Sequence, residues 1–130
     1  MNEIKIQDRP VGSNHPCYII AEVSCNHEGD MEEAKRIIDA AVAGGADAVK
    51  IQTYTADTMT RAFDNKADDT IWADIDLHDL YQKAQTPWEW TLPLKDYAHG
   101  KGVHFFSSPF DETAVDFLVD DVGVPCLKVA

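Results

Sequence analysis

The stretch AVKIQTYT, residues 48 to 55, decides the fold. It follows the glycine pair Gly44 and Gly45, which ends a helical pattern, and its first half carries apolar residues typical of a buried parallel strand. Lys50 and Gln52 stand two residues apart, so both side chains should face the same side, which in a closed barrel can be the interior. We expect Lys50 to meet a phosphate or carboxylate, with Gln52 fixing its orientation. The alternative is a lysine that extends past the strand end to water.

The chain before this stretch predicts a strand and a helix. The apolar run at residues 17–23 has strand length and ends in a polar cluster, Ser24 to Gly29. Asp30 is the expected N-cap of a helix with an apolar stripe that includes Ile37 and Ile38. Residues 3–7 predict a short edge strand and residues 8–16 a turn-rich connector. Residues 1–16 are therefore predicted to be an N-terminal β flap with its connector.

The chain after this stretch predicts further elements in alternation. Residues 56–77 are acidic and lack periodicity, which predicts a lid docked by Phe63, Ile71 and Trp72. Helices are expected at 79–84, at 86–99 with Thr86 as the N-cap, and at 111–119. Strands are expected at 103–106 and, as a fourth strand, at 124–130.

Four parallel strands with crossover helices predict the first half of a (β/α)₈ TIM barrel over residues 17–130. A whole barrel needs roughly 250 residues, so 130 can hold only half, with the fourth strand as an unpaired edge. The alternative is a doubly wound sheet. It is disfavoured because the sequence has neither a GxGxxG loop after its first strand nor a Walker motif.

The composition restricts the partners. The net charge of −12 argues against a nucleic acid or an anionic membrane surface as partner. No apolar run reaches the roughly 18 residues of a membrane span, which favours a cytoplasmic location. The three cysteines form no CxxC pair, so we expect reduced thiols, with an inert Cys25.

Polar side chains gather where the predicted strands end, which suits an anionic substrate. Serine hydroxyls can bind phosphate oxygens, while lysines supply charge; the alternative for the serines is capping of loose backbone groups. A lone His27 without a second ligand favours a hydrogen-bonding role, so no metal ligand is assigned. The candidate residues are Asn26, Glu28, Lys50, Gln52, Ser107, Ser108, Phe110 and Lys128.

A family resemblance is carried by NHEG, KIQT, SSPF and the final LKVA, in that order and spacing. From residue 18 to residue 130 the chain resembles the N-terminal half of the catalytic barrel of a sialic acid synthase. KIQTYTADT, TPWEW and SSPFDETAVDFL resemble the pseudaminic acid synthase branch more than the N-acetylneuraminate branch. N-acetylneuraminate and legionaminate synthases are the alternatives within the family.

The resemblance implies a condensation of phosphoenolpyruvate with an acetamido sugar aldehyde to a nine-carbon 2-keto acid, with release of phosphate. It implies that Lys50, Ser108 and Lys128 hold the phosphate and carboxylate, that Gln52 faces the sugar and that Glu28 is an acid or base. Phe110 would line the pocket. The implied cofactor is a divalent metal, Mn²⁺ or Mg²⁺.

The resemblance also implies parts that these 130 residues do not contain. These are four further strands with two histidine metal ligands, and a small domain that swaps across a homodimer and brings an arginine to the sugar. We therefore expect the 130 residues alone to be inactive and to associate through their apolar strand face. A different hypothesis is that the half barrel is a binding or assembly module without catalysis.

Overall fold

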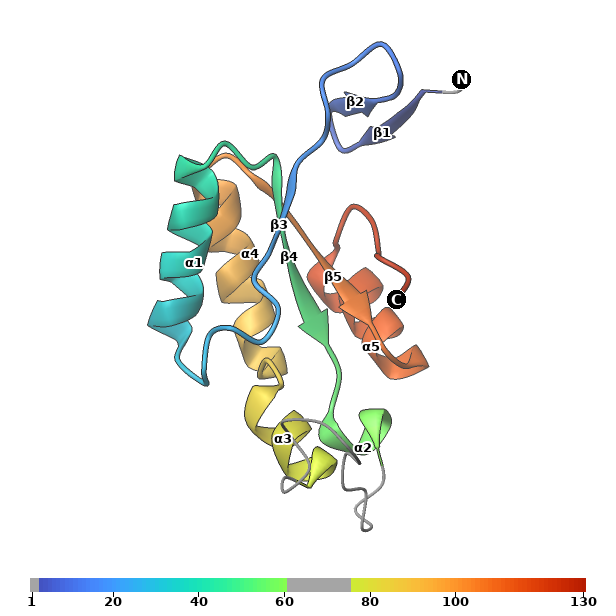
Figure 1. Ribbon diagram of the computed structural model, residues 1–130. Helices are drawn as coiled ribbons and strands as arrows, with labels where there is room; N and C mark the ends of the chain where they lie inside the picture. The colour runs from blue at the N-terminus through green and yellow to red at the C-terminus, as the bar shows by residue number, and fades with distance from the viewer. Residues whose placement is uncertain (1–2, 61–75) are drawn as a thin grey trace, which may run out of the picture.

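The computed structural model of the chain describes residues 3–60 and 76–130, and it shows an α/β fold built on a parallel sheet. The sheet has the order β3-β4-β5, formed by β3 (Ile20–Glu22), β4 (Ala48–Thr53) and β5 (His104–Pro109). Helices α1 (Met31–Ala43) and α4 (Thr91–Gly100) lie together on one side of this sheet (Figure 1). Three parallel strands of the predicted barrel are thus confirmed, and the half barrel as a whole stays a prediction.

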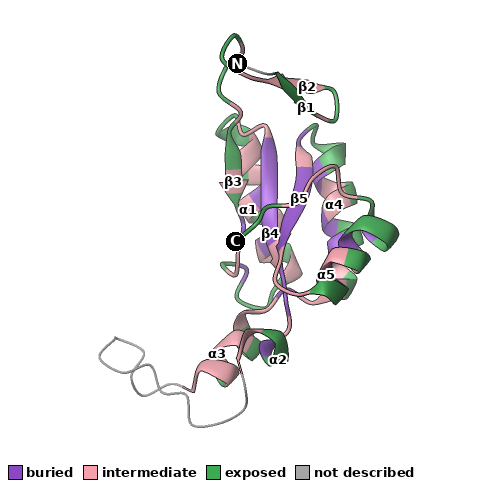
Figure 2. Cartoon of the chain, turned by 90° about the vertical axis from the view of Figure 1, so that its right-hand side faces the viewer, coloured by how far each residue is buried: buried purple, intermediate pink, exposed green. Residues whose placement is uncertain are grey.

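Strand β4 divides its side chains between two faces, as its alternation predicts. Val49 and Ile51 are fully buried in the core with Ile38 of α1, Leu94 of α4 and Phe105 of β5. Lys50 and Gln52 alternate with these residues and therefore lie on the other face of the sheet. In Figure 2 β4 is buried except at the half-buried Gln52, whereas β3, at the edge of the sheet, is exposed at Ile20 and Glu22.

Helix α1 begins and ends where the sequence predicts. The Asp30 side chain accepts a hydrogen bond from the backbone N–H of Glu32, at 2.8 Å, and Glu32 and Glu33 occupy the first turn, where the helix dipole favours acids. Gly45, with φ of 81°, follows the C-cap and reverses the chain. The Tyr97 hydroxyl of α4 donates to Asp39 of α1, which joins the two helices.

The boundaries of β5 and α4 differ from the prediction. Strand β5 continues to Pro109, so Ser107 and Ser108 lie within it. The predicted start, at residue 86, of the helix that precedes β5 was wrong, because a 3₁₀ turn, η1 (Trp88–Trp90), comes before α4. Pro93 lies in the first turn of α4, where the helix needs no N–H from it.

After β5 the chain forms α5 (Glu112–Asp116), and the predicted helix there is confirmed with Asp111 as its N-cap. It continues as a π-helical segment, η2 (Phe117–Val122), which ends at Gly123 with φ of 65°. In Figure 2 α5 lies beyond the β5 edge of the sheet.

The predicted fourth strand at residues 124–130 was wrong within the described structure. This segment makes one parallel bridge, between Ser107 and Leu127, together with the hydrogen bond from the Lys128 N–H to the Ser107 carbonyl, at 3.0 Å. Residues 128–130 are exposed. The apolar run broken by Lys128 predicted a strand, but the segment pairs with β5 at this single bridge, which is too little for a strand.

The N-terminal segment forms a hairpin of β1 (Ile4–Ile6) and β2 (Arg9–Val11). The predicted connector at residues 8–16 is therefore partly strand. Two contacts anchor the hairpin to the sheet: Arg9 pairs with Asp47 at 2.6 Å, and the Asp8 carboxylate lies 3.2 Å from Nε2 of His104. In Figure 1 the hairpin lies at the end of the sheet where β3 and β4 begin.

The predicted lid falls mostly on residues 61–75, outside the described residues, and Phe63, Ile71 and Trp72 lie there too. Its first residues are not irregular: α2 (Ala56–Met59) forms one turn, closed by a capping box between Thr55 and Thr58. Helix α3 (Leu77–Ala84) begins at the N-cap Asp76. Over residues 3–60 and 76–130 no helix is long and apolar enough to cross a membrane.

Candidate anion-binding face

The face of the sheet opposite α1 and α4, which we call the open face, carries a lysine whose side chain is buried. Lys50 of β4 has 5% of its side chain exposed, and its Nζ lies 3.2 Å from Oε1 of Glu22 on β3 and 3.4 Å from Oγ of Ser108 on β5. Glu22 is the register partner of Lys50. An ammonium carries three donors, and among residues 3–60 and 76–130 these two contacts use two of them, so a third can serve a ligand. The positive charge on β4 thus lies between an acid from β3 and a hydroxyl from β5.

Lys50 and Lys128 both lower the pKa of the Glu22 carboxyl. The hydrogen bond from Lys50, and then its charge, hold the pKa of the Glu22 carboxyl below its usual value of 4.5, and the charge of Lys128 lowers that pKa further. The Glu22 side chain is 59% exposed, so solvent screens the pair. The carboxylate is therefore ionised at neutral pH and reaches solvent, while its lysine partner is buried.

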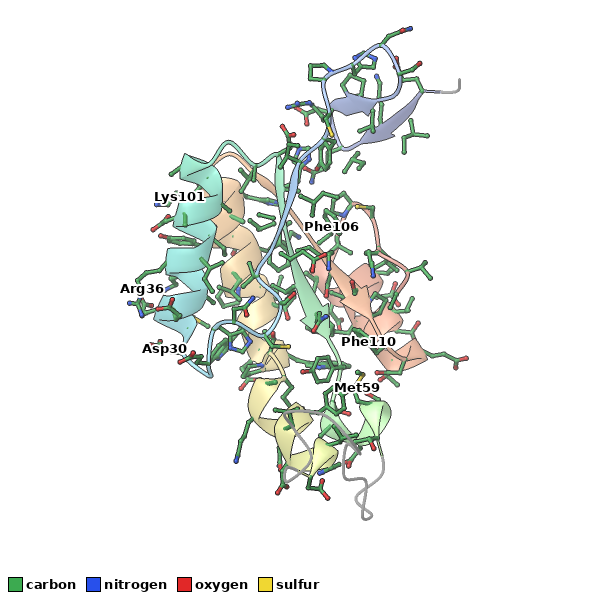
Figure 3. All side chains as sticks on the ribbon, in the orientation of Figure 1. Asp30, Arg36, Met59, Lys101, Phe106 and Phe110 are labelled. Carbon is green, nitrogen blue, oxygen red and sulfur yellow. The ribbon has the colours of Figure 1, made fainter. Side chains whose placement is uncertain are left out.

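Two other predicted site residues, Gln52 and Phe110, lie near Lys50 and Ser108 in the sequence, in β4 and directly after β5. Gln52 is the register partner of Ser108, and its Oε1 accepts a hydrogen bond from Sγ of Cys25 at 3.2 Å. Phe110 follows β5, and its ring packs edge-on against Tyr54 with centroids 5.6 Å apart. Figure 3 shows Phe106, the register partner of Lys50, on the side of the sheet away from α1. A buried aromatic side chain thus lies beside the lysine.

Ser107 and Ser108 lie on opposite faces. The Ser107 hydroxyl lies 2.7 Å from Oγ1 of Thr53 and donates to the Ile51 carbonyl at 3.2 Å, and Ser107 is fully buried. The Ser107 side chain thus lies on the core side of the sheet. The binding role of Ser107 stays a prediction that this geometry does not support, whereas Ser108 contacts Lys50.

We expect the two serines to behave differently when each is replaced by alanine. Ser107→Ala leaves the buried Thr53 hydroxyl without its side-chain partner and should lower the free energy of unfolding by about 1–3 kcal/mol. Ser108→Ala should change it much less and should weaken phosphate binding. Urea unfolding and phosphate titration of both variants test this, and equal stability losses would contradict the assignment of faces.

The predicted residues of the loop after β3 lie elsewhere. Asn26 and Glu28 are exposed and line a surface hollow of about 510 Å³ at the start of α1, together with His27, Asp30, Glu33 and Arg36. Figure 3 shows Asp30 and Arg36 on the α1 side of the molecule. Lys50 and Ser108 do not line this hollow. The catalytic role of Glu28 and the binding role of Asn26 stay predictions, because the structure does not bring these side chains to Lys50.

His27 fixes this loop from inside. The imidazole is fully buried, its Nδ1 accepts a hydrogen bond from the Gly29 N–H at 3.1 Å, and Nε2 lies 3.0 Å from Oγ1 of Thr86. Because Nδ1 accepts, Nε2 carries the proton and donates to Thr86. The ring also packs edge-on against Trp90, with centroids 5.5 Å apart. His27 thus serves as the hydrogen-bonding residue that its isolation in the sequence favours.

His27 should make stability depend on pH. Burial lowers the pKa of the His27 imidazole below 6.5, so the unfolded chain binds a proton that the folded chain excludes. The contribution is therefore fully present above pH about 6.5 and is lost as pH falls through the folded pKa, with a slope of at most about 1.4 kcal/mol per pH unit. Urea unfolding between pH 7 and pH 5 should show this slope.

The matched variant is His27→Gln, which keeps polar atoms and loses the titration. Its pH slope should be smaller than that of the wild type. Burial also lowers the pKa of His99, so some pH dependence should persist in the variant. Identical slopes in the two proteins would contradict this role of His27.

The described residues offer no metal site. Within residues 3–60 and 76–130, no group of three or more His, Cys, Asp or Glu side chains could hold a metal ion. The described residues therefore hold no ligand set for the divalent metal, whose ligands the family resemblance implies outside these 130 residues.

The residue that sequence reasoning missed is Glu22. It lies inside an apolar strand, where an acid is unusual, and in the register opposite Lys50. An acid and a lysine in neighbouring parallel strands are a pattern that could have found it. Because the strand is mostly apolar, the site residues were predicted in the polar cluster that follows it.

The fold is that of an α/β protein with a parallel sheet, and one face of this sheet brings together a buried lysine, an ionised glutamate and a serine hydroxyl. The model of the NeuB family matches residues 37–130, and the chain belongs to this family.

Relatives and solved structures agree with this assignment. The chain is 43% identical over 104 residues to a pseudaminic acid synthase of Campylobacter jejuni, covering 78% of this chain and 30% of the relative. It is 36% identical over 124 residues to an N,N'-diacetyllegionaminic acid synthase of Legionella pneumophila, covering 93% and 35%. The crystal structure of an N-acetylneuraminic acid (sialic acid) synthetase from Leptospira borgpetersenii, in complex with citrate, superposes with a TM-score of 0.83 at 32% identity. That match covers 98% of this chain and 41% of the other. The chain thus spans about a third of the length of the curated relatives it matches.

Proposed function

We propose that the protein carrying this chain condenses phosphoenolpyruvate with an acetamido sugar aldehyde to give a nine-carbon 2-keto acid and phosphate. The observation that carries this is the buried Lys50 ammonium, held between Glu22 and Ser108 with a donor to spare. The synthases among the relatives support the reaction class, and their resemblance favours the pseudaminic acid branch.

Phosphoenolpyruvate presents two anionic groups, and the open face presents two cations. Lys50 is fixed by its neighbours, whereas Lys128 is exposed and acts on Glu22 through its charge. In this proposal, Lys50 and the Ser108 hydroxyl bind one anionic group and Lys128 binds the other.

The C3 carbon of phosphoenolpyruvate bonds to the aldehyde carbon, whose oxygen takes up a proton. A water adds to C2, and one of its protons passes to a base, which balances the proton taken up by the aldehyde oxygen. The C2–O bond to phosphate then breaks, the phosphate leaves with the bridging oxygen and takes up the remaining C2 hydroxyl proton, and C2 becomes the ketone. Lys50 offsets charge that moves onto phosphate as it leaves, so its interaction strengthens along the reaction.

Glu22 is the better placed base for the water. It lies on the same face as Lys50 and is ionised at neutral pH, so it can take a proton and can stabilise positive charge that develops at C2. Glu28, the acid or base that the resemblance implies, lines the hollow at the start of α1 instead. Gln52 lies one row further along β4, and in this proposal it meets the sugar. A homodimer and a divalent metal belong to this proposal through the resemblance alone.

The test is an incubation of the purified full-length protein with phosphoenolpyruvate and single acetamido sugars, in the presence and absence of Mn²⁺ or Mg²⁺. We expect equal amounts of phosphate and a nine-carbon 2-keto acid, detected by mass spectrometry, with an altro-configured diacetamido sugar. Product from a manno-configured sugar instead would keep the reaction class and contradict the branch. Phosphoenolpyruvate consumption that no sugar stimulates would contradict the function.

A further inference from the structure

A thiol and a phenol hold the amide of Gln52. Sγ of Cys25 lies 3.2 Å from Oε1 of Gln52 and 3.3 Å from the hydroxyl of Tyr54. Cys25 belongs to the loop after β3, while Gln52 and Tyr54 lie at the end of β4. The three groups therefore form a chain of contacts between two strand ends, and the reaction proposed above gives no role to two of them.

Tyr54 is the fixed end of this chain. Its side chain is buried, and its ring packs edge-on against Tyr81 and Phe110, with centroids 5.9 and 5.6 Å apart. Its backbone carbonyl accepts a hydrogen bond from Nε1 of Trp88 at 3.3 Å. A ring packed on two sides has little rotational freedom, so its hydroxyl marks one position in space.

The direction of the hydrogen bonds follows from the single hydrogen of the thiol. Sγ of Cys25 donates it to Oε1 of Gln52, so the hydrogen bond between the sulfur and Tyr54 is donated by the Tyr54 hydroxyl. Burial, and then the hydrogen bond with Cys25, raise the pKa of this hydroxyl, which agrees with its role as a donor. With its oxygen engaged, the Gln52 amide presents its NH₂ group away from Cys25, and an amide NH₂ is a donor only.

We propose that Cys25 and Tyr54 are positioning residues that turn the Gln52 NH₂ group toward the ligand, so that the substrate atom bound there is a hydrogen-bond acceptor. This rests on the proposed function, in which that substrate is the acetamido sugar and the acceptor is a hydroxyl or the carbonyl of an acetamido group. A merely space-filling thiol would make the same packing contacts without fixing the amide. The difference is open to experiment.

The first experiment observes the amide directly, without activity. In ¹⁵N-labelled full-length protein, the Gln52 NH₂ signals are identified by their loss in Gln52→Glu. We expect Tyr54→Phe, which removes one oxygen two groups away, to shift these signals in the same direction as Cys25→Ala, and Cys25→Ser to retain most of the wild-type shift. Cys17→Ala, which removes an exposed thiol elsewhere, is the control and should leave them unchanged. Unchanged Gln52 signals in Tyr54→Phe would overturn the proposal.

The second experiment separates the two substrates in the synthase assay. Loss of one neutral hydrogen bond of roughly 1 kcal/mol corresponds to about a five-fold change. We expect Cys25→Ala and Tyr54→Phe to raise KM for the sugar by about this factor, with KM for phosphoenolpyruvate within about two-fold and Cys25→Ser close to wild type. Equal rises in both KM values, or none, would overturn the positioning role. A wild-type protein without synthase activity would contradict the proposed function, while the amide signals would still decide the roles of Cys25 and Tyr54.

Discussion

Replacing Lys50 by methionine is expected to lower kcat/KM for phosphoenolpyruvate by roughly 100- to 1,000-fold, the effect typical of losing one preorganised charge or donor in an active site. The variant keeps an unbranched side chain of similar length and removes the ammonium that lies between Glu22 and Ser108. The loss should appear in kcat as well as in KM, because the charge on phosphate changes during the proposed condensation.

Two further variants test whether the loss is specific to the Lys50 ammonium. Lys50→Arg should also fail, because a planar guanidinium does not fit where a compact ammonium lies beside Phe106 and Ser108. Lys101→Met is the matched control: Lys101 pairs with Asp39, its side chain is 41% exposed, and its loss should leave kcat/KM within about two-fold. Unchanged phosphoenolpyruvate saturation and turnover in Lys50→Met would remove Lys50 from the site.

Phe105→Ala is expected to lower the free energy of unfolding by about 3–5 kcal/mol, the range for truncating a buried phenylalanine. Phe105 is fully buried, in the core that the sheet forms with α1 and α4. Urea unfolding measures the loss. Val129→Ala is the control, because Val129 is 89% exposed and its truncation should change the value by less than about 0.5 kcal/mol.

This second result also tests which face of the sheet packs against the helices. Phe105 and Phe106 are neighbours in β5, and only Phe105 belongs to the core with Ile38 and Leu94. A loss below about 1 kcal/mol for Phe105→Ala would contradict the described packing, and with it the placement of Lys50 on the opposite face.

The sequence predicted what depends on local pattern. The two-residue period of β4 placed Lys50 and Gln52 on one face, and the Asp30 cap and Gly45 fixed the ends of α1. These features depend on the residues of one element and its caps. Membership of the family followed from four motifs spread over the chain, and the comparisons confirm it.

The predictions that failed depend on contacts between elements. The length of β5 is set by its pairing with β4 as far as Pro109, which the apolar run could not show. Residues 124–130 have a strand-like sequence but pair only at Ser107. Glu22 was overlooked because its meaning comes from a partner 28 residues away in sequence, across the strand register. The contact between Cys25 and Gln52 could not be predicted for the same reason, because it joins residues of different elements.

The proposed condensation requires sugar-dependent cleavage of phosphoenolpyruvate at the carbon side of its bridging oxygen. The measurement is an incubation of the full-length protein with phosphoenolpyruvate labelled with ¹⁸O at that oxygen, together with the acetamido sugar, followed by mass analysis of both products. We expect the label to leave in the phosphate and none to be released without sugar. Label retained in the keto acid, or label released at the same rate without sugar, would contradict the proposed condensation.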